Sequence, residues 1–188
     1  MAKTIWQLDP AHTSVEFAVK HMMFTTVRGR FTDVKGTITV DEENPDASMV
    51  EVEIGVASLD TGVEDRDKHL RSADFFDVEN YPTLTFRSKR VEGAMKEEGD
   101  KFKVIGDLTM RGKTMEVTLD AVFQGTGTDP WGGTRAGFSA TATIDRRDWG
   151  LQWNQALETG GVLVGNNVKL EIEAQAVKQT GEAKAAAD

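Results

Sequence analysis

Apolar and polar residues alternate with a period of two along most of this chain. In the stretch SVEFAVK (residues 14–20), Val15, Phe17 and Val19 fall on one side, with polar or small residues on the other. Similar alternation recurs at residues 36–40, 49–59, 83–88, 102–110, 115–123, 136–144 and 168–177. Successive side chains of a β-strand point to opposite faces, so the pattern predicts half-buried strands. About eight regularly spaced strands, each with one apolar face, favour an antiparallel sheet closed around one interior.

The apolar positions of these strands predict the interior of the barrel. On this basis we expect the following side chains to point inward: Val15, Phe17, Val19, Ile38, Val52, Ile54, Leu84, Phe86, Leu108, Met110, Val117, Leu119, Phe138 and Ile172. An eight-stranded barrel is wide enough either to be filled by such side chains or to enclose one ligand, and alternation alone leaves both possibilities open. The apolar parity also switches between Phe31 and Ile38, which predicts a bulge or sharp bend near Val34–Gly36.

One stretch departs from the strand pattern and predicts a short helix. Residues 61–64 (TGVE) have the spacing of a capping box, with Thr61 as the N-cap and Glu64 at the third helical position. Pro82 disfavours helical geometry at the residue before it, so the helix must end before Tyr81. The sequence therefore predicts one short helix inserted among the strands.

Two interpretations of this helical segment stay open. In the first, the segment closes one end of the barrel, with Asp67 and Arg71 paired across one helical turn. Its inward-packing side chains are then Leu70, Phe75 and Phe76. In the second, Arg66, His69 and Arg71 lie at the mouth of the barrel and contact a polar or phosphorylated head group, since arginine is well shaped for bidentate contact with phosphate.

Composition excludes several classes of function. The net charge of -9 argues against nucleic acid and anionic membrane surfaces as main partners, because phosphate binding relies on surplus lysine and arginine. The chain has no cysteine, so disulfides, thiol catalysis and zinc–thiolate sites are excluded. No apolar run approaches the roughly 18–20 residues of a membrane-spanning helix, so we expect no membrane insertion. The N-terminal residues MAKTIWQLDP lack an apolar signal stretch, and we therefore expect a cytoplasmic location, or a periplasmic or secreted one if the chain is a processed form.

The sequence offers little for metal binding or catalysis. Its histidines, His12, His21 and His69, lie on different elements without the short spacing of a zinc site, so we expect no metal and no cofactor. Signature motifs of common hydrolases and nucleotide-binding enzymes do not occur. The charged run at residues 145–148 (DRRD) precedes Trp149, and such runs near strand ends are usually solvated or mutually paired. We therefore expect a protein that is not an enzyme.

Five stretches in order resemble the YceI-like family, the polyisoprenoid-binding proteins. They are LDPAHTSVEFAVKH, VRGRF, SLDTGVEDRDKHLRSADFFDVENYPTLTFRS, GDLTMRGKTMEVTL and TIDRRDWGL. The resemblance runs from about Trp6 to Val177, which suggests a barrel domain over residues 1–177 and a disordered tail over 178–188. It implies an eight-stranded, lipocalin-like antiparallel barrel with one short helix, a long isoprenoid or related lipid inside, and a homodimer. Family members are mostly periplasmic or secreted, and this chain differs in showing no signal peptide.

Residues and resemblance together lead to one functional hypothesis and two alternatives. We expect the barrel to bind one long-chain isoprenoid, of polyprenyl or quinone type, or another apolar lipid, and to sequester or transport it unchanged. Each buried methylene contributes about 0.8 kcal/mol, whereas association costs roughly 4–15 kcal/mol, so only long chains bind well. The first alternative is a packed, stress-related barrel that interacts with proteins through its surface. The second, a barrel hydrolase or isomerase, requires polar groups to converge deep inside.

Overall fold

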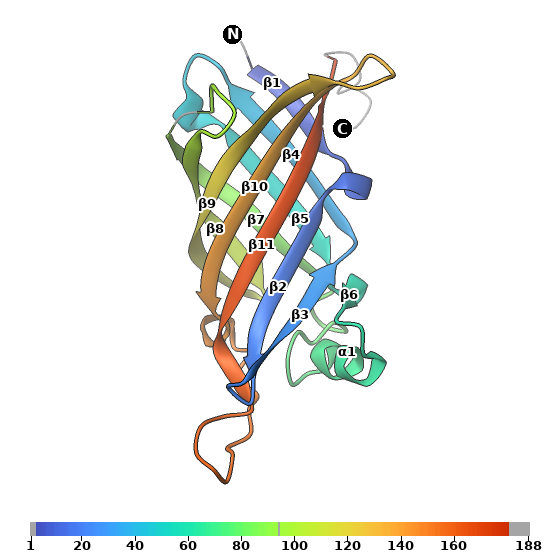
Figure 1. Ribbon diagram of the computed structural model, residues 1–188, viewed down its shortest axis with the longest axis vertical. Coiled ribbons are helices and arrows are strands. Elements are labelled where there is room, and N and C mark those ends of the chain that lie inside the picture. Colours follow the sequence, from blue (N-terminus) through green and yellow to red (C-terminus); the bar gives the residue numbers. More distant parts are fainter. Residues whose placement is uncertain (1–2, 94, 181–188) are drawn as a thin grey trace.

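The protein is an antiparallel β-barrel with one α-helix beside one end (Figure 1). The computed structural model describes residues 3–93 and 95–180. Its strands are β1 (Lys3–Leu8), β2 (Ser14–His21), β3 (Thr25–Phe31), β4 (Val34–Asp41), β5 (Met49–Gly55), β6 (Leu59–Asp60), β7 (Thr83–Gly93), β8 (Lys101–Met110), β9 (Lys113–Thr128), β10 (Thr134–Asp145) and β11 (Val164–Lys178). The helix is α1 (Glu64–Arg71), and the short 3-10 helices are η1 (Pro10–His12), η2 (Pro45–Ala47), η3 (Val56–Ser58) and η4 (Arg146–Trp149).

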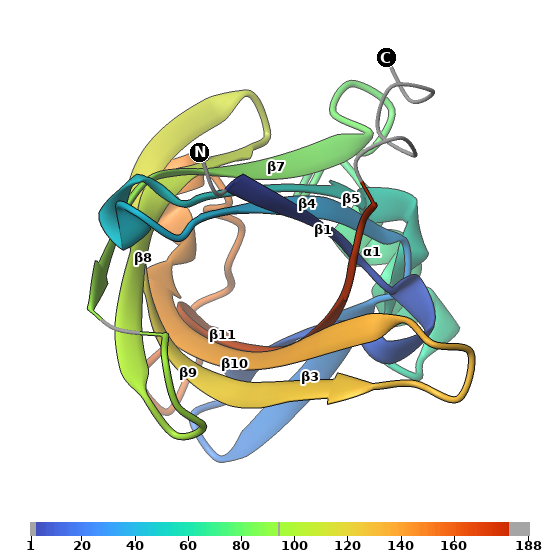
Figure 2. The same ribbon diagram turned by 90° about the horizontal axis from the view of Figure 1, so that it is seen from above.

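The sheet closes because β1 pairs on both of its edges. One edge of β1 is hydrogen-bonded to β4, and the other is paired with the end of β11, where Leu8 lies opposite Ala176. β2 continues along the earlier part of β11, so β1 and β2 form one wall strand interrupted by η1. β3 and β4 likewise form one wall strand, interrupted at residues 32–33, and β5 and β6 form another, interrupted by η3. Eight wall strands therefore surround one interior, as the sequence predicts (Figure 2).

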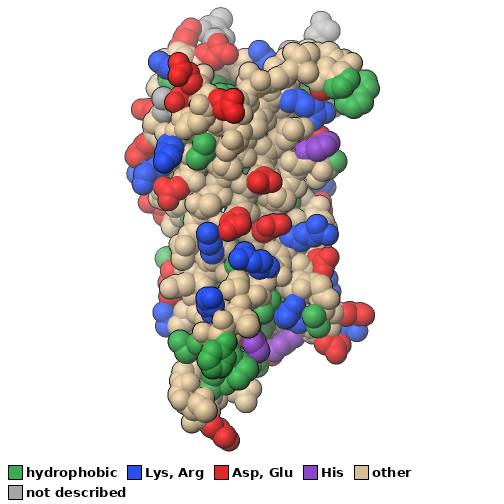
Figure 3. All heavy atoms as spheres, in the orientation of Figure 1, with side chains coloured by type: hydrophobic (Ala, Val, Ile, Leu, Met, Phe, Trp, Pro, Cys, Tyr) green, Lys and Arg blue, Asp and Glu red, His purple; other side chains and the backbone are tan. Residues whose placement is uncertain are grey.

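Strand register explains why the predicted apolar positions meet inside. In the longest pairing, between β10 and β11, Ala140 lies opposite Ile172 and Ile144 opposite Val168. The intervening positions carry polar side chains, such as Thr141 opposite Glu171, and these point to the outer surface. Figure 3 shows acidic and basic side chains spread over the outer face of the strands. Alternation along each strand thus separates an apolar interior from a charged exterior.

The change of apolar parity occurs slightly earlier than predicted. The break lies at residues 32–33, between β3 and β4, rather than near Val34–Gly36. Phe31 and Val34 both face the interior and are almost fully buried, at 6% and 2% exposed. A two-residue interruption between strands shifts the phase of the alternation, which explains how residues three apart point to the same side.

The predicted capping box at the start of the helix is wrong. α1 begins at Glu64, its N-cap is Val63, and this cap makes no side-chain hydrogen bond. The backbone N–H and hydroxyl of Thr61 instead donate to a carboxylate oxygen of Asp67. Asp67 is consequently buried and is not the partner of Arg71, which donates to the backbone carbonyl of Leu59. The tertiary position of Asp67 therefore overrides the local capping pattern.

The C-terminal strand continues past the predicted domain boundary. β11 includes Lys178, which lies opposite Trp6, and the backbone N–H of Gln179 donates to the carbonyl of Ile5 at 2.7 Å. Most of the predicted disordered tail, residues 181–188, lies outside the described residues. Within the described part of the chain, no helix has both the length and the apolar character that crossing a membrane needs.

An ion-pair network connects η1 to the hairpin between β9 and β10. A carboxylate oxygen of Asp9 lies 2.7 Å from Nη1 of Arg135 and 2.8 Å from Nδ1 of His12. Nε of Arg135 lies 2.9 Å from a carboxylate oxygen of Asp129. The hydrogen bonds from Arg135 and His12 lower the pKa of Asp9 to about 2. The network therefore holds the interrupted β1–β2 wall strand against the adjoining strands.

We expect Arg135→Met to destabilise the protein at pH 7 and to make its stability less sensitive to a fall in pH. A carboxylate whose pKa is lower in the folded state stabilises that state above the unfolded pKa and loses the effect as the pH falls toward the folded pKa. The difference in thermal midpoint between wild type and variant should thus be largest above about pH 4 and shrink toward pH 2. Lys103→Met, which removes an exposed pair with Asp120 at 3.5 Å, is the control and should change little. An equal difference at both pH values would contradict this role of Arg135.

Candidate functional site

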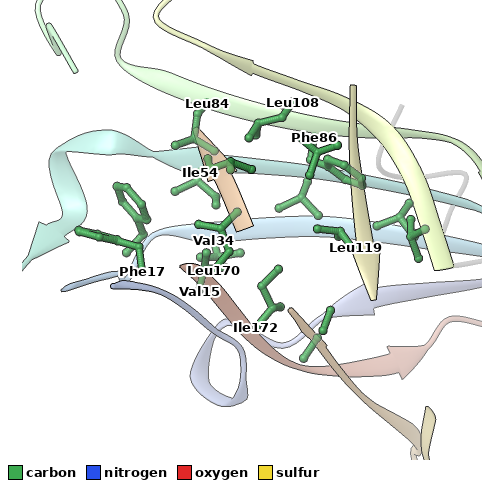
Figure 4. A pocket seen from close by; sticks show the side chains of 18 of the residues that line it. Val15, Phe17, Val34, Ile54, Leu84, Phe86, Leu108, Leu119, Leu170 and Ile172 are labelled. Carbon is green, nitrogen blue, oxygen red and sulfur yellow. The ribbon is translucent and has the colours of Figure 1, made fainter. Parts of the chain in front are cut away.

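A cavity of about 240 Å³ lies inside the barrel (Figure 4). Side chains from every wall strand line it, and almost all of them are apolar. Along β11 alone the lining extends from Val164 to Ala174, which corresponds to roughly 33 Å of strand at 3.3 Å per residue. The volume is just below the range of about 300–1,000 Å³ for pockets that hold drug-sized ligands. A small volume spread over this length describes a narrow channel rather than a round pocket.

The structure places all fourteen predicted interior residues on the cavity wall. They are Val15, Phe17, Val19, Ile38, Val52, Ile54, Leu84, Phe86, Leu108, Met110, Val117, Leu119, Phe138 and Ile172. Their contact with a ligand stays a prediction. The predicted set left out several further lining residues, among them Phe31, Val34, Phe102 and Leu170. Figure 4 shows labelled side chains from opposite walls, such as Leu84 and Val15, directed toward the same space.

The segment that contains α1 closes one end of the barrel, which we call the helix end. Its lining side chains are Leu70, Phe75 and Phe76, the three predicted to pack inward. The ring of Phe76 meets that of Phe31 edge-on, with centroids 5.8 Å apart. Phe75 is 5% exposed and lies 5.5 Å from the ring of Trp153. β6 contributes only two residues to the wall here, and its Leu59 pairs with Phe31, whose ring Phe76 contacts.

The three predicted head-group contacts lie elsewhere. Arg66 donates to the hydroxyl and the carbonyl of Thr61, both at 2.7 Å. His69 lies 2.9 Å from a carboxylate oxygen of Asp74, and Arg71 donates to a backbone carbonyl. None of Arg66, His69 and Arg71 is among the described residues that line the cavity. Head-group contact by these side chains stays a prediction, and their hydrogen bonds favour the interpretation of this segment as a structural closure.

Among the described residues that line the cavity, the charged one is Arg146, which sequence reasoning missed. The run DRRD was expected to be solvated or mutually paired, and this holds for Arg147, whose Nη2 lies 2.6 Å from the carboxylate of Asp145. Arg146 instead is 4% exposed and lines the cavity. A signal was present in the sequence, because Arg146 continues the inward parity of Phe138, Ala140 and Ile144. That parity was not extended to Arg146 because the strand ends at Asp145.

Backbone carbonyls surround the guanidinium of Arg146. Nε donates to Gly165 at 2.8 Å, Nη1 to Leu151 at 2.6 Å and Nη2 to Val164 at 3.4 Å. The guanidinium carbon lies 5.8 Å from the centre of the Phe75 ring, in the geometry of a cation–π contact. Burial lowers the pKa of Arg146 below its usual value, because removal from water disfavours the charged form.

The charged residues on either side of Arg146 pair with each other outside the cavity. Hydrogen bonds from the side chain and backbone of Arg147 lower the pKa of Asp145 to about 2, so the Asp145 carboxylate pairs with Arg147.

Among residues 3–93 and 95–180, no three His, Asp or Glu side chains gather as metal ligands would. His12 and His69 are each bonded to an aspartate, while His21 ends β2 opposite Thr25. The surface that the described residues offer to a ligand inside the cavity is therefore apolar.

Comparison with known proteins identifies the family. The model of the YceI-like domain matches residues 6–176. The chain belongs to the YceI-like family. A UPF0312 protein of Pseudomonas paraeruginosa and protein YceI of Escherichia coli O157:H7 are each 45% identical to it over 141 residues, covering 75% of this chain and 72% of the relative.

Solved structures of YceI-like and related proteins share the fold. A YceI protein of Campylobacter jejuni is 30% identical, with a TM-score of 0.71 over 86% of this chain and 90% of that one. BcnA of Burkholderia cenocepacia is 23% identical, with a TM-score of 0.76 over 89% and 98%. A domain of Saccharophagus degradans, described as polyisoprenoid binding, is 15% identical, with a TM-score of 0.70 over 93% and 98%. The predicted lipocalin-like barrel of eight strands is confirmed.

We expect Phe75→Ala to destabilise the protein strongly. The substitution removes a buried ring that contacts Trp153 and Arg146 at the helix end, and truncations of this kind cost about 3–5 kcal/mol. Chemical denaturation followed by tryptophan fluorescence measures the free energy of unfolding. Phe24→Ala is the matched control, since its ring is 81% exposed, and it should change stability by no more than about 0.5 kcal/mol. Equal effects of the two substitutions would show that Phe75 does not close the barrel.

Proposed function

We propose that this chain binds one long-chain isoprenoid lipid inside its barrel and sequesters or carries it without altering it chemically. The observation that carries the proposal is a narrow, apolar cavity whose lining extends from one end of the barrel to the other. β7 begins at the helix end and runs to Gly93, so that Met95 and Phe102 line the opposite end, here called the far end. A linear apolar chain fits such a channel better than a bulky ligand does.

Burial energetics favour a long guest. Each methylene removed from water contributes about 0.8 kcal/mol, against a cost of association of roughly 4–15 kcal/mol. A chain of about eight carbons therefore gains little, whereas a chain of about 20 carbons or more gains a clear surplus. The residues that line the cavity supply apolar surface over enough length to cover such a chain. This supports a lipid ligand over a small polar metabolite.

Family membership directs the choice among lipids. The structurally similar domain of Saccharophagus degradans is described as polyisoprenoid binding, which supports an isoprenoid rather than an unbranched acyl chain. The cavity also weighs against the alternative of a packed barrel that acts only through its surface. A non-enzymatic role agrees with a lining that carries one charged side chain, Arg146, among the described residues. Homodimerisation and a cytoplasmic location stay predictions from the sequence.

Affinity should rise steeply with the length of the isoprenoid chain. We expect isoprenoid alcohols of increasing length to displace a fluorescent lipid from the barrel with falling dissociation constants, since each additional unit buries more methylene and methyl groups. The rise should level off once the chain is longer than the cavity. Competition titrations without detergent measure these constants. An affinity independent of chain length, or no displacement at any length, would contradict binding inside the barrel.

Filling the channel should weaken lipid uptake without unfolding the barrel. We expect Ala140→Phe to weaken lipid binding by at least about tenfold, or 1.4 kcal/mol, because Ala140 lines the cavity and a ring there occupies the path of the chain. Thr141→Phe is the matched control, since Thr141 is exposed on the outer face of the same strand. Circular dichroism and thermal melts establish that both variants fold. Equal binding by the two variants would place the ligand outside the cavity.

A further inference from the structure

We propose that the turn between β2 and β3 docks the helix end of the barrel onto the surface of a zwitterionic phospholipid bilayer. The turn consists of Met22, Met23 and Phe24 and is here called the apolar tip. Its side chains would enter the head-group region of the bilayer, while the barrel stays outside the hydrocarbon core. The inference goes beyond the proposed function, because the protein without a bound lipid suffices to test it.

The first argument is the exposure of the apolar tip. Met22, Met23 and Phe24 are consecutive, and they are 39%, 64% and 81% exposed. Single apolar side chains on a surface need no explanation, whereas a contiguous group marks a site of contact with a protein or a membrane. Figure 3 shows hydrophobic side chains gathered at the lower end of the molecule, where the β2–β3 turn lies in Figure 1. The tip is therefore accessible to a partner.

The second argument is the backbone of the apolar tip. The N–H of Phe24 donates to the carbonyl of His21 at 3.1 Å, which closes a turn around Met22 and Met23. Both methionines have positive φ values, 50° and 64°. Asparagine and glycine adopt such values at lower cost and are the usual residues of hairpin turns of this kind. Turn geometry therefore does not explain the two methionines, whereas contact with an apolar partner would.

The third argument is that the neighbouring loop holds the apolar tip in its exposed position. The N–H of Met22 donates to the carbonyl of Leu163 at 2.8 Å. Met23 packs against Gly161, where a Cβ atom would lie 2.6 Å from the methionine sulfur. Val162 of the same loop is half-buried. The tip and this loop thus form one protruding surface at the helix end.

Unpaired cations beside the apolar tip favour a phospholipid surface. Lys20 and Arg28 are exposed, and in the β2–β3 pairing they lie opposite the neutral residues Thr26 and Ala18. Within the described part of the chain, neither cation pairs with a carboxylate. Basic side chains next to an apolar anchor strengthen binding at a membrane interface, where lipid phosphates attract them. The adjoining loop contributes one exposed carboxylate, Glu158, so the cations outnumber it.

The overall charge of the chain selects the kind of bilayer. A net charge of -9 repels a strongly anionic surface, and a zwitterionic bilayer avoids this repulsion. Its phosphate groups still lie within reach of cations that flank an inserted apolar tip. The combination of local cations with an acidic whole therefore matches phosphatidylcholine better than an anionic lipid.

The area of the apolar tip is too small for a stable dimer. With roughly 200 Å² of surface for each large apolar side chain, the exposed fractions of the three residues correspond to roughly 400 Å². A specific protein interface buries about 800 Å² on each partner. Lipids, in contrast, rearrange around a small protruding turn, and binding to them requires only that the apolar side chains leave water. A bilayer is therefore a better match for the tip than a second copy of this chain.

The opposite end of the barrel supplies a matched control. Trp131 is 84% exposed in the hairpin between β9 and β10, which lies at the far end (Figure 1). The loop between β7 and β8 at that end carries Glu97 and Glu98, both exposed. Carboxylates disfavour approach to lipid phosphates, so the exposed tryptophan beside these acidic residues should not dock.

Flotation with phosphatidylcholine vesicles tests the docking surface. The wild type should float with the vesicles, and Met23→Ser combined with Phe24→Ser should lower the partition coefficient at least about tenfold, because two exposed apolar side chains are lost. Thermal melts should match the wild type, since neither side chain is buried. Trp131→Ser should bind within about twofold of the wild type. An equal loss of binding in both variants, or no binding by the wild type, would overturn the proposal.

A fluorescent label gives a second measurement that does not depend on a loss of binding. The chain has no cysteine, so Phe24→Cys and Trp131→Cys each introduce a single thiol for an environment-sensitive dye. When vesicles are added, we expect the emission of the dye to shift to shorter wavelength at position 24 and to stay unchanged at position 131. A shift at position 131 that equals or exceeds the shift at position 24, or no shift at either, would overturn the proposed orientation.

Sedimentation separates docking on a bilayer from self-association. Without vesicles, we expect the wild type and the variant with Met23→Ser and Phe24→Ser to have the same mass. A wild-type dimer that this variant dissociates, together with no flotation of the wild type, would assign the apolar tip to a second copy of the chain and overturn the proposal. Uptake of an isoprenoid into the barrel is measured separately, so failure of docking leaves the proposed function standing.

Discussion

The whole architecture depends on hydrogen bonding along both edges of β1. Pairing of this strand with β4 on one side and with the end of β11 on the other converts an open sheet into a barrel without free edges at this point. Closure gives every inward side chain a common interior, and the charged outer face follows from the same alternation. The channel is thus a direct consequence of sheet closure, and its apolar lining a consequence of strand register.

At the helix end of the barrel the wall includes a very short strand, β6. β6 has two residues, and Phe75 and Phe76, which follow α1, line the cavity at this end. η4 and the start of β11 bring Arg146 against Phe75 at the same place. One end of the channel therefore combines aromatic closure with a buried cation, whereas the far end is apolar.

Much of the fold and of the cavity was predictable because period-two alternation is a local property of the sequence. All fourteen interior residues followed from it. The errors arose where tertiary contacts decide: Thr61 bonds to the buried Asp67 instead of capping the helix, and the parity break depends on where β3 leaves β2. Arg146 was missed because a charged run at a strand end usually faces water. The parity of Phe138, Ala140 and Ile144 already indicated an inward side chain, and the burial of Arg146 agrees with it.

The central claim is that the channel is a lipid-binding site, and native mass spectrometry of protein purified without detergent tests it most directly. The account predicts a stoichiometric adduct that is released by organic solvent and identified as an isoprenoid. An acyl lipid in its place would retain the channel as a binding site and refute the choice of isoprenoid. A mass equal to that of the chain alone, with no uptake when long-chain lipids are added, would contradict the account.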